Sequence, residues 1–113
     1  MTFVRIGQFK ALPGTTDALR QIYETQAIPV IRQAAGNISA LLLQQHQSPE
    51  SFMAITIWNT QDDAEAYDKS GQALEMVNKI RFAFAGPPTL GTYEAFGMRE
   101  HRVLPRTNSD FSG

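Results

Sequence analysis

The spacing of hydrophobic and polar residues divides the chain into four predicted strands and three predicted helical stretches. The strand-like segments, rich in β-forming residues and bounded by turn residues, are 3–10, 38–47, 51–58 and 89–98. Apolar residues at helical spacing occupy 16–35, 61–70 and 72–84. Pro29 lies inside the first helical stretch, where its missing N–H predicts a kink near Ala27–Ile28.

Cap and turn residues indicate where the helices begin and end. Thr15 or Thr16 can cap the first helix, and Thr60 followed by Asp63 is the pattern of a capping box for the second. Gly71 predicts a break between the second and third helical stretches. The third stretch is predicted to bury three apolar side chains, those of Leu74, Val77 and Ile80.

The predicted order is β-α-β-β-α-α-β, and merging the last two helices gives the βαββαβ pattern of the ferredoxin-like fold. We therefore predict the α+β class, with an antiparallel sheet and all helices on one face. Residues 1–98 form one predicted domain. The polar segment 99–113 lacks periodicity and is predicted to be a C-terminal arm or tail.

Both faces of the predicted sheet are apolar, although an antiparallel sheet covered on one side should alternate apolar with polar residues. In the third strand the two faces carry Phe52, Ala54, Thr56 and Trp58 against Met53, Ile55 and Ile57. The helices can cover only one of these faces. The other predicts a homodimer packed sheet to sheet; a monomer with exposed aliphatic side chains is the alternative.

The composition excludes several classes of protein. With no cysteine in 113 residues, the chain has no disulfide and no cysteine-ligated metal. A formal net charge of −1 gives no electrostatic footprint for nucleic acid, and apolar runs such as 40–43 are too short to span a membrane. We expect a soluble, cytoplasmic domain that binds a small molecule and has no nucleic-acid or membrane partner.

No phosphate-binding, dinucleotide-binding, nucleophile-elbow or zinc-protease motif occurs in the sequence. The two histidines, His46 and His101, stand far apart in the chain. We therefore predict neither a metal site nor a bound cofactor.

After the third predicted strand, Trp58, Ala64, Tyr67 and Ser70 follow the spacing W-x5-A-x2-Y-x2-S. With the preceding βαββ order and a Pro-Gly turn after the first strand, residues 3–97 resemble the antibiotic biosynthesis monooxygenase family of dimeric α+β barrels. The resemblance implies a dimer joined by its sheets, with a pocket between helices and sheet in each subunit. Some members of that family oxidise phenolic or polyketide substrates with O₂ and no cofactor; others degrade haem or isomerise a small phosphorylated sugar.

Departures from the family pattern narrow this choice. Many members carry histidines at positions that are Tyr67 and Gln72 here, so acid–base chemistry by imidazole is missing at both. In an ungapped match to the haem-degrading branch, the asparagine, tryptophan and proximal histidine fall on Gly7, Tyr67 and Val77. Without an axial ligand the haem iron has no anchor, which disfavours haem degradation.

Five residues are candidates for the site. Tyr67 and His46 are the predicted catalytic residues, the first as a hydrogen-bond donor and the second as a base. Trp58, Tyr23 and Arg81 are the predicted substrate-binding residues, through stacking, the phenol hydroxyl and charge stabilisation. Each also has a structural interpretation: the three aromatic residues can serve core packing, and Arg81 and His46 can be solvent-exposed.

The first functional hypothesis is a cofactor-independent monooxygenase that oxidises a small phenolic or quinol-like compound with O₂. A non-catalytic dimeric small-molecule-binding domain is the alternative from another class. An isomerase acting on a small carbonyl compound is a third, and it requires Arg81 and His46 to converge. The arm 99–113 is predicted to contact the partner subunit through three apolar residues, Val103, Leu104 and Phe111.

Overall fold

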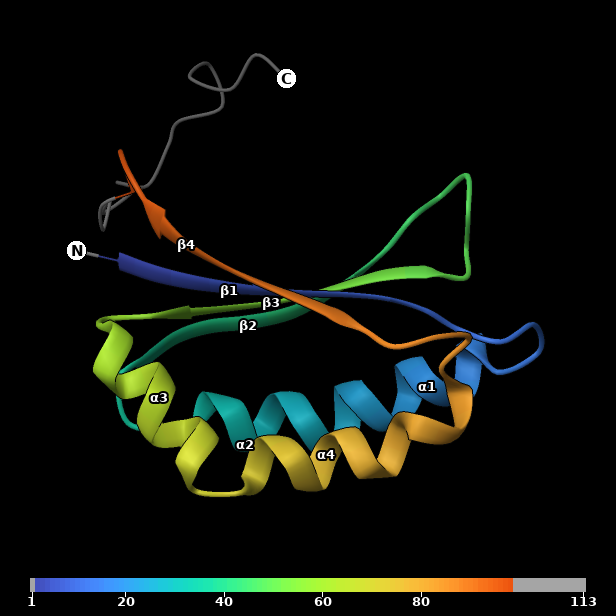
Figure 1. The fold of residues 1–113 in the computed structure, drawn as a ribbon, viewed down its shortest axis with the longest axis horizontal. Helices are drawn as coiled ribbons and strands as arrows, with labels where there is room; N and C mark the ends of the chain where they lie inside the picture. Colours follow the sequence, from blue (N-terminus) through green and yellow to red (C-terminus); the bar gives the residue numbers. More distant parts are fainter. Residues whose placement is uncertain (1, 99–113) are drawn as a thin grey trace, which may run out of the picture.

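A four-stranded antiparallel sheet with every helix on one face forms the architecture (Figure 1). The computed structural model describes residues 2–98, so the predicted arm and its contacts to a partner lie outside the described residues. In chain order the elements are β1 (Thr2–Lys10), α1 (Thr16–Ile22), a π-helical turn (Tyr23–Ala27), α2 (Ile28–Arg32), β2 (Asn37–Gln44), β3 (Ser51–Trp58), α3 (Gln61–Lys69), α4 (Gln72–Ile80), a 3₁₀ turn (Arg81–Ala83) and β4 (Thr89–Ala95). The predicted α+β, ferredoxin-like fold is confirmed.

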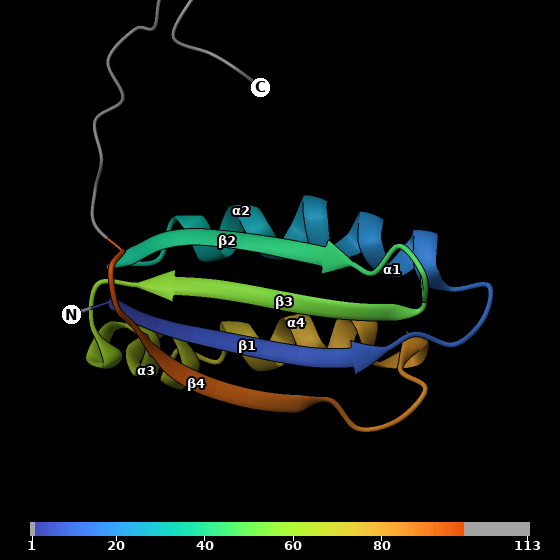
Figure 2. The same ribbon diagram turned by 90° about the horizontal axis from the view of Figure 1, so that it is seen from above.

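The strands lie in the order β2-β3-β1-β4, so β1 and β3 form the middle of the sheet (Figure 2). β1 pairs antiparallel with both β3 and β4, and its register sets Arg5 opposite Thr56 and Gly7 opposite Ala54. Because side chains alternate along a strand, these four residues share the face that the helices cover. The central strands thereby form the floor of the site described below.

None of the helices within residues 2–98 lies on the opposite face of the sheet (Figure 1). The register places a set of mostly apolar side chains on it, here called the open face: Val4, Ile6, Leu41, Leu43, Met53, Ile55, Ile57 and Tyr93. Several of these side chains are well exposed in the single chain, Leu43 at 43% and Tyr93 at 49%. The prediction that the helices leave one apolar sheet face uncovered is confirmed for the single chain.

The core lies between the helices and the covered face of the sheet. Phe9 stacks on Phe52 with ring centroids 5.6 Å apart, and Phe84 packs against Phe9 at 5.3 Å. Leu19 and Trp58 are the largest side chains that are completely buried. Burial of these apolar groups supplies most of the folding free energy.

The prediction that α4 buries Leu74 is wrong, since Leu74 is 59% exposed. α4 instead turns Met76 and Ile80 into the core, with Ala73 packed beside them. Residues 73, 76, 77 and 80 follow the helical i, i+3, i+4, i+7 pattern, and position 74 lies outside that stripe.

Two cap predictions have different outcomes. The Thr60 hydroxyl accepts a hydrogen bond from the Asp63 amide at 3.1 Å, so α3 is capped as predicted. Thr15 occupies the N-cap position of α1 but makes no side-chain cap bond; its hydroxyl donates to the Leu12 carbonyl at 2.6 Å. Gly71, with φ of +84°, separates α3 from α4 as predicted.

The predicted kink near Pro29 takes the form of a π-helical turn. This turn, Tyr23–Ala27, ends where Ile28 donates its amide hydrogen to the carbonyl of Tyr23, five residues back. In a regular α-helix the amide of residue 29 would donate a hydrogen bond to the Thr25 carbonyl. Pro29 has no amide hydrogen, so this bond is missing and the α-helical pattern is interrupted there.

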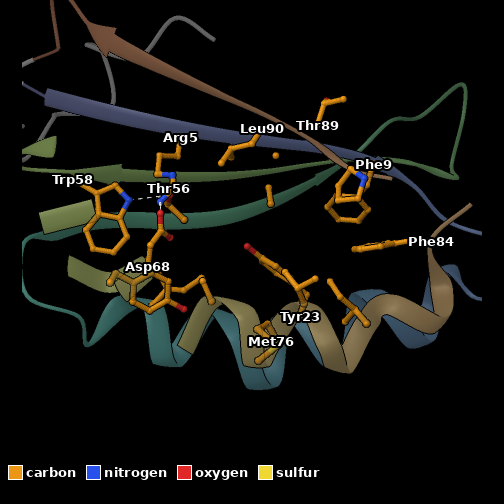
Figure 3. Close-up of a pocket in the computed structure, with 18 residues that line it drawn as sticks. Arg5, Phe9, Tyr23, Thr56, Trp58, Asp68, Met76, Phe84, Thr89 and Leu90 are labelled. Carbon is orange, nitrogen blue, oxygen red and sulfur yellow. Dashed lines mark hydrogen bonds and ion pairs between the residues drawn. The ribbon is translucent and has the colours of Figure 1, made fainter. Parts of the chain in front are cut away.

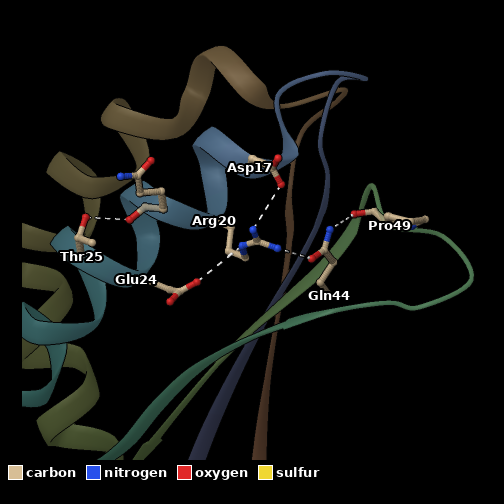
Figure 4. Close-up of polar contacts among 7 residues, drawn as sticks. Asp17, Arg20, Glu24, Thr25, Gln44 and Pro49 are labelled. Carbon is tan, nitrogen blue, oxygen red and sulfur yellow. Dashed lines mark hydrogen bonds and ion pairs between the residues drawn. The ribbon is translucent and has the colours of Figure 1, made fainter.

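Polar contacts join α1 to the sheet on the outer surface (Figure 4). The Arg20 guanidinium lies 3.4 Å from Asp17 and 3.7 Å from Glu24, and it donates to Gln44 of β2 at 3.3 Å. Gln44 in turn donates to the Pro49 carbonyl at 2.8 Å. Within residues 2–98, no helix has the length and apolarity required to cross a membrane.

Candidate functional site

A cavity of about 290 Å³ lies between the sheet and the helical layer. Its floor comes from β1 and β3, its walls from the π-helical turn, α3 and α4, and one side from the start of β4. Figure 3 shows the arrangement: Arg5, Thr56 and Asp68 lie at one end of the cavity, and Phe9 and Phe84 lie at the other. The volume is near the lower limit of ordinary ligand sites, which suits a small planar molecule.

At the polar end, the central strands present Arg5 and Thr56 side by side, as their register requires. The Trp58 indole N–H donates to the Thr56 hydroxyl over 2.9 Å. The Arg5 guanidinium forms an ion pair with the Asp68 carboxylate of α3 (Figure 3). Strand residues and a helix residue are thereby linked at one end of the cavity.

Trp58 and Tyr67 form one aromatic wall. Their ring centroids are 5.4 Å apart with planes tilted by 34°, and both residues are largely buried. The spacing between them has a structural cause: β3 ends at Trp58, the Thr60 cap starts α3 at once, and Tyr67 follows two helical turns later. Ala64 is completely buried, and its small side chain allows α3 to approach the sheet.

Tyr23 reaches the cavity from the π-helical turn, with its hydroxyl directed toward the sheet (Figure 3). Burial raises the pKa of the Tyr23 phenol to about 12, and the nearby Tyr67 phenol adds to this rise. Burial also raises the pKa of Tyr67, with a further contribution from the Asp68 carboxylate. Both phenols therefore remain protonated at neutral pH and can donate hydrogen bonds to a ligand.

The floor between the two ends is almost bare. Gly7 has no side chain, and its neighbour across the strands is the small Ala54. A Cβ atom built on Gly7 would have one neighbour within 4 Å, the Thr89 carbonyl oxygen at 3.9 Å. Flat space therefore lies over the middle of the sheet, bounded by Phe9 and Phe84 at its apolar end.

Three of the five predicted site residues, Trp58, Tyr67 and Tyr23, line the cavity. The other two do not contribute to it. His46 is exposed in the loop between β2 and β3, and Arg81 is exposed on the 3₁₀ turn, where it donates to the Asn78 side chain at 2.9 Å. The predictions that His46 acts as a base in the site and that Arg81 binds the substrate would require both side chains to line this cavity. Neither side chain does so.

Sequence reasoning missed Arg5, Thr56 and Asp68, the polar residues beside the aromatic wall. A signal for Arg5 was present: it falls in phase with Phe3 and Phe9 along β1, so strand alternation turns this charge inward. Asp68 gave no such signal, because it directly follows Tyr67 on a polar helix.

Residues 2–98 contain no group of three histidine, cysteine, aspartate or glutamate side chains able to hold a metal ion. The positions matched to the haem-degrading branch, Gly7, Tyr67 and Val77, all line the cavity. Val77 has no atom that can ligate iron, so the residues present do not fit a haem held in that way.

Comparison with known proteins identifies the family of the chain and other structures with the same fold. The family model described as antibiotic biosynthesis monooxygenase matches residues 2–79. No curated protein sequence matches the chain significantly. Three solved structures of similar fold come from Nitrosomonas europaea, Mycobacterium tuberculosis and Streptomyces nogalater.

The Nitrosomonas protein NE2512, of unknown function, superimposes with a TM-score of 0.76 at 16% identity, over 90% of this chain and 96% of its own. Rv0793 from M. tuberculosis superimposes with a TM-score of 0.75 at 14% identity, over 88% of this chain and 100% of its own. A mutant of SnoaB, a cofactor-independent oxygenase from S. nogalater, superimposes with a TM-score of 0.74 at 15% identity, over 93% of this chain and 98% of its own. At these identities the structures show a shared fold, and the family match over most of the chain shows that it belongs to the antibiotic biosynthesis monooxygenase family.

Proposed function

We propose that the chain is a cofactor-independent monooxygenase that oxidises a small, planar phenolic or quinol-like compound with O₂. The observation that carries this proposal is the cavity of about 290 Å³, in which two protonated phenols and an aromatic wall lie between a polar end and an apolar end. Membership of the family and the fold shared with a cofactor-independent oxygenase support it.

The proposed reaction takes its electrons from the substrate itself. For a substrate with an activated CH₂ group, such as an anthrone, loss of a proton to solvent gives an electron-rich anion that transfers one electron to O₂. The carbon radical and superoxide then combine to a peroxide anion, which takes up a proton from solvent and eliminates water to leave a carbonyl. Two C–H bonds break; one oxygen atom enters the product, and the other leaves as water.

The protein has three tasks in this scheme. Trp58 and Tyr67 provide a surface against which a planar ring can pack. The hydroxyls of Tyr23 and Tyr67 can donate hydrogen bonds to the oxygen on which negative charge develops. The apolar end excludes water, which strengthens these hydrogen bonds and protects the radical pair.

The same cavity could serve a non-catalytic binding domain. Turnover of a bound compound distinguishes the oxygenase from such a binding domain. The isomerase alternative has less support, because His46 and Arg81, on which it depends, do not line the cavity. The cytoplasmic location stays a prediction.

We also propose that two copies associate through the open face. That face carries apolar side chains on all four strands, and the described neighbours of Ile55 at its centre, Ile6 and Leu41, are uncharged. A second copy can therefore face it around a two-fold axis without like-charge repulsion, and the contact would hide the side chains that the single chain exposes.

The test of the oxygenase proposal is O₂ uptake by the purified, metal-free protein with anthrones, hydroquinones and catechols. Because these compounds autoxidise, each is measured against a control without protein. We expect uptake well above the control, reduced at least tenfold in Trp58→Phe and in Tyr67→Phe, since either change removes a donor or ring surface at the site.

A third variant, Gly7→Val, tests the cavity itself. Its φ is not in the left-handed region and its Cβ has room, so valine should fold well in this strand while filling the floor. We expect loss of uptake with an unchanged circular dichroism spectrum. Uptake that equals the protein-free control for every compound contradicts the oxygenase proposal.

A further inference from the structure

Among residues 2–98, Arg5 is the one basic residue that lines the cavity. It occupies a helix-facing position of β1, where its neighbours on the same face are Phe3, Gly7 and Phe9. Its side chain is only 17% exposed. A guanidinium at that depth loses much of its hydration, which costs free energy unless other groups replace the water.

Asp68 replaces part of that water. Within residues 2–98, Asp68 is the one acceptor that the Arg5 guanidinium contacts. The donor in this contact is Nη1 of Arg5. Arginine carries five N–H donors, so Nε and Nη2 keep donors for a ligand. The Asp68 side chain is 40% exposed at the rim, where solvent screens its charge more than that of Arg5.

Three of the four titratable groups in the described lining of the cavity can donate hydrogen bonds to an anion. The four groups are Arg5, Asp68, Tyr23 and Tyr67. Both phenols stay protonated and act as donors, and the carboxylate is engaged by Arg5. The cavity thus offers several donors to a negative oxygen but no free base to create one.

We propose that Arg5 selects the ionised form of the substrate, holding its phenolate or enolate oxygen while the ring lies over Gly7 against the aromatic wall. This inference rests on the proposed function and names the substrate class within it: planar compounds acidic enough to enter as anions. Asp68 is a positioning residue, which fixes the guanidinium from the rim side. Arg5 sits beside Thr56 at the polar end, so the anionic oxygen is placed there (Figure 3).

The test uses binding and needs no turnover. The probes are 4-nitrophenol, which ionises near neutral pH, and 4-nitroanisole, its methyl ether, which cannot ionise. Equilibrium dialysis gives both affinities, and the absorbance of the phenolate gives the pKa of bound 4-nitrophenol. We expect the phenolate to bind about tenfold more tightly than the ether, and the pKa of the bound phenol to fall by about one unit, as a nearby cation produces.

Arg5→Gln should abolish both the preference and the fall in pKa, whereas Arg5→Lys, which keeps the charge, should retain part of each. Asp68→Asn breaks the same ion pair but leaves the guanidinium, so the preference for the phenolate should persist. Arg20→Gln is the matched control: it removes an equal charge and breaks ion pairs on α1, outside this cavity.

Equal affinities for the two probes in the natural protein overturn the inference. So does a folded Arg5→Gln variant that keeps the preference, or a loss of both probes to the same extent in Arg5→Gln and Asp68→Asn, which marks a purely structural ion pair. The two proposals fail separately. Phenolate preference without O₂ uptake contradicts the oxygenase alone, and O₂ uptake without phenolate preference contradicts the role of Arg5 alone.

Discussion

At the scale of single residues, the two buried phenols determine how the cavity responds to pH. Because burial raises the pKa of Tyr23 to about 12, the unfolded chain loses this proton before the folded chain does. The protonated Tyr23 phenol therefore contributes fully to the free energy of unfolding at pH values below about 10. This contribution declines as pH rises toward 12. Tyr67 shifts in the same direction, so the hydrogen-bond donors of the site survive throughout the neutral range.

We expect the free energy of unfolding to fall by about 2 kcal/mol more in the natural protein than in Tyr23→Phe between pH 10 and pH 12. Urea titrations of both proteins across that range give this difference, in which the titration of lysines cancels. Tyrosinate absorbance should show in parallel that one phenol ionises only near pH 12 in the folded chain. Parallel pH profiles for the two proteins would contradict this reading of Tyr23.

The sequence predicts a site residue well only where a local pattern of strand, turn or helix residues fixes its position. Trp58 ends a strand that turn residues bound clearly, and Tyr67 lies at fixed spacing in a capped helix, so both placements followed from the chain itself. His46 was chosen for its chemistry alone, and the hairpin loop carries it into solvent. Arg5 and Asp68 meet only when α3 packs on β1, a tertiary contact that no local pattern encodes.

At the scale of elements, the bounds that rest on local signals were predicted closely and those that rest on pairing were not. β3 runs over 51–58 as predicted, and Gly71 divides the last two helices. β4 stops at Ala95, because Ala95 is the last residue that pairs with β1. Proline predicted an interruption of the first helix, but its π-helical form depends on packing against the rest of the core.

The two threonines at helix starts give a matched prediction at this scale. Thr60→Ala removes the acceptor of the Asp63 amide, and we expect it to lower the free energy of unfolding by about 1 kcal/mol. Thr15→Ala should cost less, because the Thr15 side chain caps no amide of α1. Urea denaturation of both variants measures this, and an equal loss in the two would show that the Thr60 cap contributes nothing special.

At the scale of the whole molecule, the open face should control assembly. Ile55→Lys places a charge near the centre of that face, so two copies would bring like charges together in a desolvated contact. We expect light scattering at micromolar concentration to give a dimer for the natural protein and a monomer for Ile55→Lys. Leu74→Lys is the control, since Leu74 is 59% exposed on α4, outside both the open face and the cavity.

A monomeric mass for the natural protein contradicts the proposed dimer. A dimeric mass for Ile55→Lys places the contact elsewhere on the surface. Circular dichroism of each variant shows whether the fold is retained, so that loss of association is not confused with loss of structure.

The alternation along β1 and β3 has a consequence for how such a protein can change. On β1 the odd-numbered residues from Phe3 to Phe9 face the helices, and on β3 the even-numbered residues from Phe52 to Trp58 do so; all of them except Phe3 and Phe52 line the cavity. Residues of the other parity face away. A combinatorial library restricted to the cavity-facing parity should therefore diversify ligand recognition without changing the proposed association of two copies, and a library of the other parity should do the reverse. One pair of strands thus carries two surfaces on which selection can act independently.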